Sequence, residues 1–343
     1  MANKKINPES LMIKSMKGAF SDYVDILEKR SKDDGEDISS TGFEELDEKI
    51  NSGLMPGQLI ILAARPGMGK SAYALQILEN IAATGKPVLL YTMEMGINEI
   101  IERIIIRNTG ISTKSMKTGR LSGDEWARFA AALPYVQNLP LFVNDYPSHT
   151  DESIKISSEK FIEESKSIND IDTALITIDY LQLMKSSEKM NNKNEDVGAI
   201  TRNMKEMARN LNSPVLLLSQ LNRSLENRPN KRPQMSDLRD SGSIEQDADI
   251  ILALYRNEYY HPEKEEFAGI AESIILKNRE GALGTVYSKF DGTKYKFSNM
   301  DKNDFLNIAV GAMKNNNNGS YKQKKIHKRI DETLRSMEDD DPF

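Results

Sequence analysis

Short apolar runs alternate with longer amphipathic stretches between Gly53 and Lys296. Strands that are almost continuously apolar, and that alternate with helices, are typical of a mostly parallel sheet with helices on both faces. We therefore predict an α/β fold in one domain of roughly 250 residues. Its strands are expected at 59–64, 87–94, 139–145, 174–184, 214–221, 248–256 and 271–278.

An amphipathic segment precedes this region. Residues 9–30 place apolar side chains at spacings of three and four before the polar stretch SKDDGED, which predicts a helix. This helix could pack on its own domain or dock on a neighbouring copy of the chain, and the sequence favours neither. Its apolar positions are Leu11, Met12, Met16, Phe20, Tyr23, Ile26 and Leu27.

The C-terminal residues are polar and charged. NNNNGS (315–320) is followed by the basic stretch KQKKIHKR (322–329) and by the acidic end MEDDDPF. Such a composition buries too little apolar surface to fold by itself, and it predicts a flexible tail. We therefore divide the chain into an N-terminal linker helix (1–35), the α/β domain (36–312) and a C-terminal tail (313–343).

The composition excludes several classes of protein. A chain of 343 residues with 38% apolar and 29% charged residues is not a collagen, a coiled coil or a fully disordered protein. No apolar run approaches the ~20 residues of a membrane span, and MANKKINPES lacks the apolar part of a signal peptide, so we expect a cytoplasmic protein. The absence of cysteine excludes disulfides, and the three scattered histidines do not suggest zinc. The net charge of −6 leaves nucleic acid open, because the local clustering of Lys and Arg decides such binding.

A phosphate-binding loop follows the first predicted strand. Residues 64–71, ARPGMGKS, match G-x-x-x-x-G-K-[ST] with Ala64 in place of the first glycine. Gly67 and Gly69 let backbone N–H groups face phosphate oxygens. Lys70 reaches the outer phosphates and Ser71 ligates Mg²⁺. An ordinary Gly-rich turn is the alternative, but so relaxed a pattern arises by chance in only roughly 2–3% of chains of this length. The predicted nucleotide-binding residues are Arg65, Pro66, Gly67, Met68, Gly69, Lys70 and Ser71.

Two carboxylates end other predicted strands. Asp179 ends the run LITID, and beside a phosphate loop this is the place for a carboxylate that holds Mg²⁺. Glu94 ends PVLLYTME, where it can polarise the water that attacks the γ-phosphate. A solvated strand end is the alternative for Glu94.

From about Thr41 to Phe297 the chain resembles the C-terminal motor domain of DnaB-type replicative helicases. The matching stretches are TGFEELDEKINSGLMPGQLIILAARPGMGKS, YTMEM, TGRLSGDEWAR, LITIDYLQLM, LLSQLNRSLENRPNKRPQMSDLRDSGSIEQDADIILALYR and KNREGALGTV. SQLNRSLE followed by DLRDSGSIEQDAD is the most specific of them. The resemblance implies a RecA-like P-loop fold for 36–312, a homohexameric ring, hydrolysis of ATP with Mg²⁺, and 5′ to 3′ translocation on single-stranded DNA that unwinds duplex at the replication fork.

The resemblance also implies roles for four further residues. Gln220 is the polar sensor between the γ-phosphate and the DNA loops, and Arg103 lies against the nucleotide base. Lys277 and Arg279 in KNREG match the pair that reaches into the neighbouring subunit's ATP. Their i, i+2 spacing places both side chains on one face of a strand. Without the family, two basic residues at a strand end are more simply explained as solvent-facing charge.

DNA contacts are expected after Asp179 and after Gln220, where basic residues interrupt otherwise acidic sequence. In the family, the turn that matches Arg239-Asp240-Ser241-Gly242 grips successive phosphates, and the Gly242 amide approaches closely because it has no side chain. No aromatic residue is interleaved there, so we expect backbone tracking without base readout. The basic residues are Lys185, Lys189 and Lys193 in the first loop and Arg223, Arg228, Lys231, Arg232 and Arg239 in the second; Lys189 and Lys193 are individually more typical of solvated charge.

The chain departs from the family at both ends. The globular N-terminal domain that binds primase in such helicases is missing, so this is either a truncated protein or a compact version such as a bacteriophage encodes, which the Met-Ala-Asn start favours. MEDDDPF resembles the acidic tip of bacterial single-strand-binding proteins, with Asp where an apolar residue normally precedes the Pro; a merely solubilising end is the alternative. Primase, a helicase loader or a single-strand-binding protein are the expected partners besides DNA and the chain itself.

Two other functions compete with the motor. A RecA/RadA-like recombinase or annealing ATPase shares the core but binds DNA passively. A non-translocating ATP-dependent assembly factor would have lost processivity with the N-terminal domain. The KNREG pair and the block from Ser219 to Tyr255 favour the helicase over the recombinase.

Overall fold

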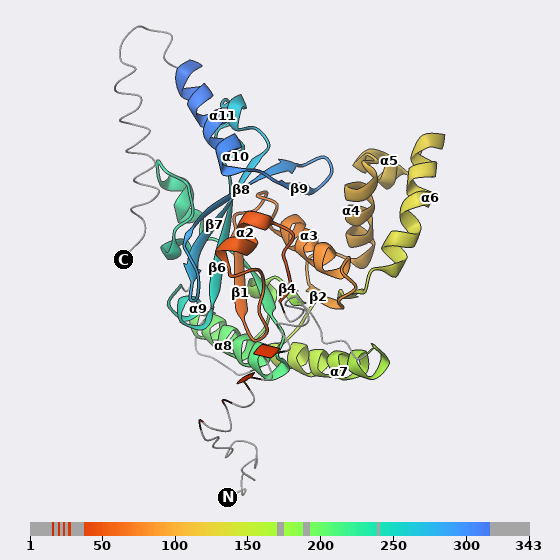
Figure 1. Ribbon diagram of the computed structural model, residues 1–343, viewed down its shortest axis with the longest axis vertical. Helices are drawn as coiled ribbons and strands as arrows, with labels where there is room; N and C mark the ends of the chain where they lie inside the picture. Colours follow the sequence, from red (N-terminus) through yellow and green to blue (C-terminus); the bar gives the residue numbers. More distant parts are fainter. Residues whose placement is uncertain are drawn as a thin grey trace, which may run out of the picture. The chain divides into compact units, whose positions relative to one another are not determined.

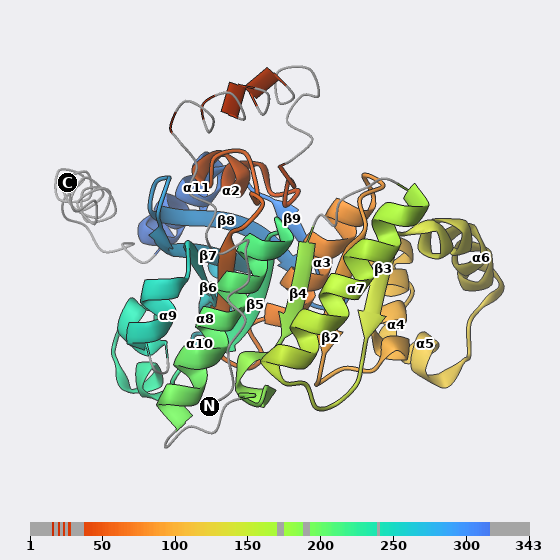
Figure 2. The ribbon, with the colours of Figure 1, turned by 90° about the horizontal axis from the view of Figure 1, so that it is seen from below.

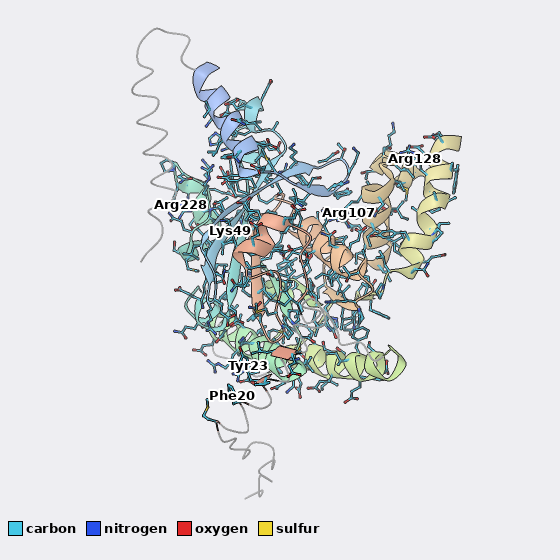
Figure 3. The ribbon with its side chains drawn as sticks, viewed as in Figure 1. Phe20, Tyr23, Lys49, Arg107, Arg128 and Arg228 are labelled. Atoms are coloured by element: carbon cyan, nitrogen blue, oxygen red, sulfur yellow. The ribbon has the colours of Figure 1, made fainter. Side chains whose placement is uncertain are left out.

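The computed structural model describes residues 16, 20, 23, 24, 27, 28, 38–169, 175–187, 193–238 and 241–315. The chain divides into two compact units, Met1–Ile38 and Ser39–Phe343. In the first unit Met16, Phe20, Tyr23 and Leu27 are helical and exposed, and two of them are labelled in Figure 3. The predicted tail from 316 onward lies outside the described residues, and the predicted division at 35/36 and 312/313 stays a prediction.

One nine-stranded sheet forms the centre of the second unit, in the order β3-β2-β4-β5-β1-β6-β7-β8-β9. The six strands from β3 to β6 in this order run parallel, whereas β7, β8 and β9 are antiparallel (Figures 1 and 2). The strands are β1 (Leu59–Ala64), β2 (Val88–Thr92), β3 (Leu141–Asn144), β4 (Leu175–Asp179), β5 (Val215–Gln220), β6 (Ile250–Arg256), β7 (Ile270–Asn278), β8 (Gly284–Asp291) and β9 (Lys296–Asn299).

The seven predicted strands correspond to β1–β7, and the predicted mostly parallel α/β sheet is confirmed. The run 174–184 is wrong as a single strand, because β4 ends at Asp179 and the short 3₁₀ helix η2 (Leu181–Leu183) follows. The β8–β9 hairpin was not predicted. Its strands, GTVYSKFD and KFSN, mix apolar with polar residues and therefore lack the continuous apolar run by which the other strands were predicted.

Helices cover both faces of the sheet. One buried cluster contains side chains of α2, α3 and α4, and the other contains side chains of α7, α8 and α9. Figure 2 shows α7 and α8 in front of the strands, with α3 and α4 behind. The helices are α2 (Glu44–Lys49), α3 (Lys70–Ala82), α4 (Ile97–Thr109), α5 (Thr113–Thr118), α6 (Gly123–Asn138), α7 (Asp151–Asn169), α8 (Lys193–Leu211), α9 (Ser241–Asp247), α10 (Asn257–Tyr260) and α11 (Lys302–Asn315). In the part of the chain that the structure describes, none of these helices is long and apolar enough to cross a membrane.

Candidate active site

The loop between β1 and α3 has the backbone that a phosphate cradle requires. Gly67 and Gly69 adopt φ of +82° and +96°, a conformation that L side chains rarely adopt. A Cβ on Gly67 would lie 2.8 Å from Tyr259 Cε2, and one on Gly69 would lie 3.1 Å from Phe297 Cζ. Helix α3 begins at Lys70, so its first N–H groups are available to an anion at this loop.

Lys70 lies beside the carboxylate that ends β4. Its Nζ is 3.5 Å from Asp179 Oδ1 and 4.3 Å from the centroid of the Tyr180 ring. Burial lowers the pKa of the Lys70 ammonium, while the carboxylates of Asp179 and Glu94 act in the opposite direction. The ammonium group of Lys70 therefore lies in a buried environment where nearby carboxylates favour its charged form.

Asp179 and Ser71 fit a magnesium ion. Both border the same small cavity, so their side chains lie close together. The other residues that line this cavity are mostly apolar, and the cavity itself is not a metal site. Asp179 is 4% exposed, and its Oδ1 forms the ion pair with Lys70 at 3.5 Å. Carboxylate and hydroxyl oxygens are ligands that Mg²⁺ accepts when phosphates and water complete its coordination. Within the described residues no group of three or more His, Cys, Asp or Glu could hold a metal, so the structure offers no all-protein metal cage there.

A cavity of about 440 Å³ extends from the phosphate loop. Glu94, which lies just beyond β2 and is exposed, borders it, as do Gln220 at the end of β5 and Arg103 on α4. The structure thus brings together, in one cavity, predicted residues that are far apart in the sequence. These are Arg65, Pro66, Gly67, Gly69, Lys70, Ser71, Glu94, Arg103 and Gln220.

Two residues of the predicted loop have internal partners. Arg65 Nη1 donates to the Leu221 carbonyl at 2.9 Å, and Arg65 Nε donates to Glu226 at 2.8 Å. Its guanidinium therefore connects the loop to the segment after β5. Met68 is 1% exposed and belongs to the hydrophobic core, so its side chain fixes the loop to the core.

The β8–β9 hairpin and the end of β6 contribute residues that sequence reasoning missed. Arg256 Nη1 donates to the Gly67 carbonyl at 3.0 Å, and the guanidinium lies 4.3 Å from the centroid of Phe290. Tyr295 lies under the Arg103 guanidinium at 4.9 Å. Arg256 could have been found, because it ends a parallel strand beside the phosphate loop and ligands bind at the carboxyl ends of such strands. Tyr295 had no signal once the hairpin was missed.

Lys277 and Arg279 do not border the nucleotide cavity of their own chain. Lys277 Nζ donates to the Ala248 carbonyl at 2.7 Å. Arg279 Nη1 donates to Asp249 Oδ1 at 3.0 Å, and Nη2 donates to the Gln246 carbonyl at 2.5 Å. Both side chains therefore reach the end of α9 or the residues directly after it, and the side chain of Arg279 remains 47% exposed.

The expected DNA-binding residues are placed unequally. Lys185 and Arg223 are exposed. Arg228, labelled in Figure 3, donates to Asp237 at 2.6 Å and to Gln234 at 2.7 Å, so its guanidinium is engaged within its own loop. Among the remaining expected residues, Gly242 is exposed on α9 with open space around it, and Lys193 begins α8 rather than lying in the loop. Arg232 pairs with Glu272, and Lys231 Nζ lies 5.8 Å from the centroid of the Tyr260 ring. Lys189, Arg239 and Asp240 lie outside the described residues.

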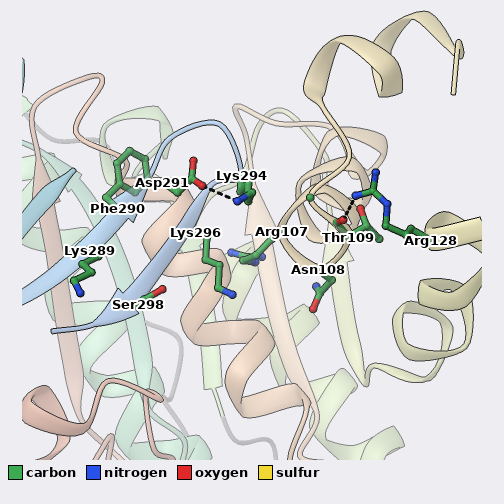
Figure 4. A pocket seen from close by; sticks show the side chains of 11 residues that line it. Arg107, Asn108, Thr109, Arg128, Lys289, Phe290, Asp291, Lys294, Lys296 and Ser298 are labelled. Carbon is green, nitrogen blue, oxygen red and sulfur yellow. Dashed lines mark hydrogen bonds and ion pairs between the residues drawn. The ribbon is translucent and has the colours of Figure 1, made fainter. Parts of the chain in front are cut away.

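A second cavity, of about 660 Å³, lies between the end of α4 and the β8–β9 hairpin (Figure 4). Much of its basic charge is engaged within the chain. Arg128 donates to the Thr109 carbonyl at 2.6 Å, and Lys294 pairs with Asp291 at 3.1 Å. The first contact connects α6 to α4 and the second lies within the turn of the β8–β9 hairpin, and we assign no ligand to this cavity. Its basic lining residues are Arg107, Arg128, Lys289, Lys294 and Lys296.

Comparison with protein families gives one match over most of the chain. The family model described as the DnaB-like helicase C terminal domain matches residues 39–299. The replicative DNA helicase DnaB of Geobacillus stearothermophilus is 39% identical over 306 residues, which are 86% of this chain and 66% of that protein. DnaB of Buchnera aphidicola subsp. Baizongia pistaciae is 40% identical over 268 residues, which are 78% of this chain and 56% of that protein.

Solved structures give the same result. A structure described as an ATPase domain superposes with a TM-score of 0.77 at 34% identity and covers 84% of this chain and 100% of its own. A DnaB-like replicative helicase, described with its interactions with primase, gives a TM-score of 0.74 at 33% identity over 84% of this chain and 68% of its own. These likenesses confirm the predicted resemblance and the RecA-like fold.

Proposed function

This chain belongs to the family of DnaB-like helicase C-terminal domains, and we propose that it is the motor of a replicative DNA helicase. It would form a homohexameric ring, hydrolyse ATP and translocate 5′ to 3′ on single-stranded DNA. The chain spans 56% and 66% of the lengths of the two DnaB relatives described above, so the activity of the whole protein is part of this proposal.

The observation that carries the proposal is the convergence of chemistry at the carboxyl ends of four parallel strands. β1 leads into the phosphate loop and Lys70, β2 is followed by Glu94, β4 ends in Asp179 and β5 ends in Gln220. In spatial order these are neighbours, β2-β4-β5-β1. A nucleotide at the phosphate loop would therefore meet a cation, a metal-binding carboxylate, a general base and a polar sensor at one edge of the sheet.

The residues divide the work of hydrolysis. The loop N–H groups and Lys70 bind and orient the phosphates. Ser71 and Asp179 would hold Mg²⁺, which neutralises charge on the β- and γ-phosphate oxygens when it is bound. Glu94 is exposed in the cavity, where it can orient an attacking water and accept its proton.

Lys277 and Arg279 would complete the ATP site of a neighbouring copy of the chain. Lys277 and Arg279 lie away from the nucleotide cavity of their own chain, and Arg279 is half exposed. A trans arginine stabilises the charge of the transition state, and the ring brings one subunit's pair to the next subunit's nucleotide. Arg103, stacked near Tyr295, would lie against the base.

DNA would be bound by the loops after β4 and β5. The contacts would come from Lys185, from Arg223 and from the turn at Arg239, Asp240 and Gly242. Arg228 would hold the second loop in place through its contact with Asp237. We propose a cytoplasmic, phage-encoded or bacterial setting, and primase, a helicase loader or a single-strand-binding protein as partners. The primase proposal is supported by the DnaB-like neighbour described with its interactions with primase.

Fork unwinding tests the proposal. We expect single-stranded DNA to stimulate ATP hydrolysis, and we expect unwinding of a duplex with a 5′ tail but not of one with only a 3′ tail. Glu94→Gln is the control, because it keeps the size of the side chain but removes the base. Closed six-fold rings in negative stain support the motor. Filaments on DNA with ATP and no unwinding would favour the recombinase instead.

A further inference from the structure

The side-chain amide of Gln182 joins the segment after Asp179 to the end of β5. Gln182 lies in η2 and is half-buried. Its Oε1 accepts a hydrogen bond from the Gln220 backbone N–H at 3.1 Å, and its Nε2 donates to the Ser219 hydroxyl at 3.0 Å. A longer contact of 3.4 Å joins Nε2 to the Gln220 carbonyl. One side chain thus holds two successive residues of β5, and we call this arrangement the Gln182 bridge.

The sheet explains why β5 needs this bridge. β4 pairs with β5 only up to Ile178 and Leu217, so β5 extends beyond its neighbour. On the other side, the Leu221 N–H donates to the Ala64 carbonyl of β1, and the Gln220 N–H therefore faces the missing continuation of β4. The amide of Gln182 occupies the place of that continuation and satisfies a backbone donor that would otherwise lack a partner.

The bridge also lies midway between two functional segments. Along the chain, Asp179 ends β4, Gln182 follows in η2, and Lys185 begins the first expected DNA loop. The far end of this segment is fixed to the start of α7, because Lys185 N–H donates to the His149 carbonyl at 3.0 Å and Ser187 N–H donates to Asp151 at 2.7 Å. Lys185 directly follows Met184, which caps η2, so a displacement of Lys185 that breaks these two bonds would act on η2, and through it on the strand end that carries Gln220.

We propose that Gln182 is a positioning residue that transmits DNA binding at the Lys185 loop to Gln220, and so to the γ-phosphate. Gln182 does not border the nucleotide cavity, whereas Gln220 does, so it acts through Gln220 and not on the nucleotide. This inference rests on the proposed function, since it uses the sensor role of Gln220 and the DNA contact of Lys185.

Gln182→Leu tests the inference, because leucine is similar in size and makes neither hydrogen bond. Full-length protein is assayed for ATP hydrolysis with and without oligothymidylate. We expect the stimulation by DNA to fall roughly tenfold, or about 1.4 kcal/mol, because the strand end that carries Gln220 loses its connection to η2. The basal rate and the KM for ATP should stay near wild type, and the Tm should fall by only a few degrees, because the Gln220 N–H loses its partner. Gln137→Leu, on the exposed surface of α6, is the matched control and should change nothing.

Two further variants separate coupling from simple destabilisation. Gln182→Glu keeps an acceptor for the Gln220 N–H, and its carboxylate can accept a hydrogen bond from the Ser219 hydroxyl. This variant should therefore retain most of the stimulation of ATP hydrolysis by DNA. Ser219→Ala removes only the Nε2 contact; it should reduce stimulation less than Gln182→Leu and have no additional effect in the Gln182→Leu background.

Different failures have different meanings. Full stimulation in Gln182→Leu, additive effects of the two substitutions, or a parallel loss of Tm and basal rate would overturn the coupling role alone. A wild-type ATPase that DNA does not stimulate would overturn the proposed function and this inference together.

Discussion

The parallel and antiparallel strands of the sheet contribute to the nucleotide site in different ways. The parallel strands β1, β2, β4 and β5 bring Lys70, Glu94, Asp179 and Gln220 to one edge, each next to a strand end. The antiparallel strands supply support: Phe297 of β9 lies against Gly69, and Phe290 of β8 lies under Arg256.

The end of β7 shows the difference most clearly. Lys277 and Arg279 bond the end of α9 and the residues directly after it in their own chain. They lie at the end of the sheet opposite to the phosphate loop, because the end of β7 pairs with the start of β6. The parallel strands thus carry the residues that we propose hold a subunit's own ATP. The antiparallel strands contain the packing beneath the loop, and the end of β7 with the residue that follows it carries the basic pair that we propose acts on a neighbour's ATP.

Lys70→Ala should give the largest loss of ATPase activity, and it tests the role of the residues at the ends of the parallel strands. We expect no measurable ATP turnover, because the charge that draws the outer phosphates is lost, while circular dichroism and Tm show a folded protein. The loop should still form, since Gly67, Gly69 and the buried Met68 are unchanged. ATPase activity near wild type would contradict the assignment of the phosphate loop.

Arg279→Ala tests the role of the basic pair at the end of β7. A trans arginine contributes roughly 10³ to 10⁵ in turnover, or about 4–7 kcal/mol of barrier, so this variant should be nearly inactive and should still bind a fluorescent ATP analogue. If Arg279→Ala instead loses affinity for the ATP analogue, Arg279 would belong to its own subunit's site.

Mixing the two inactive variants sharpens the comparison. An interface is competent where a Lys70-intact subunit faces an Arg279-intact one, so mixed rings of Lys70→Ala and Arg279→Ala subunits should regain part of the ATPase activity. Native mass spectrometry checks that the rings are mixed. Mixed rings as inactive as their components would rule out a shared site.

Phe297→Ala should act on stability and tests the support role of the hairpin. Phe297 is 1% exposed and contacts the Tyr73 ring at 4.9 Å and the Phe290 ring at 4.5 Å. Removing this ring should lower the free energy of unfolding by about 3–5 kcal/mol, measured by urea denaturation. Phe142→Ala is the matched control, because Phe142 on β3, at the opposite edge of the sheet, is 46% exposed and should cost about 1 kcal/mol. Equal losses would show that the hairpin has no special role in support.

The sequence by itself determined the parallel half of this protein. Continuous apolar runs identify strands covered on both faces, and β1 spans the residues predicted for it, 59–64. The glycine spacing before Lys70 predicted a loop whose positive φ angles only glycine adopts easily. Asp179 and Glu94 could be predicted because a carboxylate directly after an apolar run can be recognised in the sequence alone.

Only the tertiary structure decided which residues complete the site. Gln76 bonds the backbone of Phe297 across 221 residues, and Arg256 bonds Gly67 across 189. Gln182 meets Gln220 only because β5 extends past the end of β4. A hydrogen bond between distant segments requires a particular distance and angle, and no periodicity along the chain encodes either, so these partners become visible only when the folded sheet brings them together.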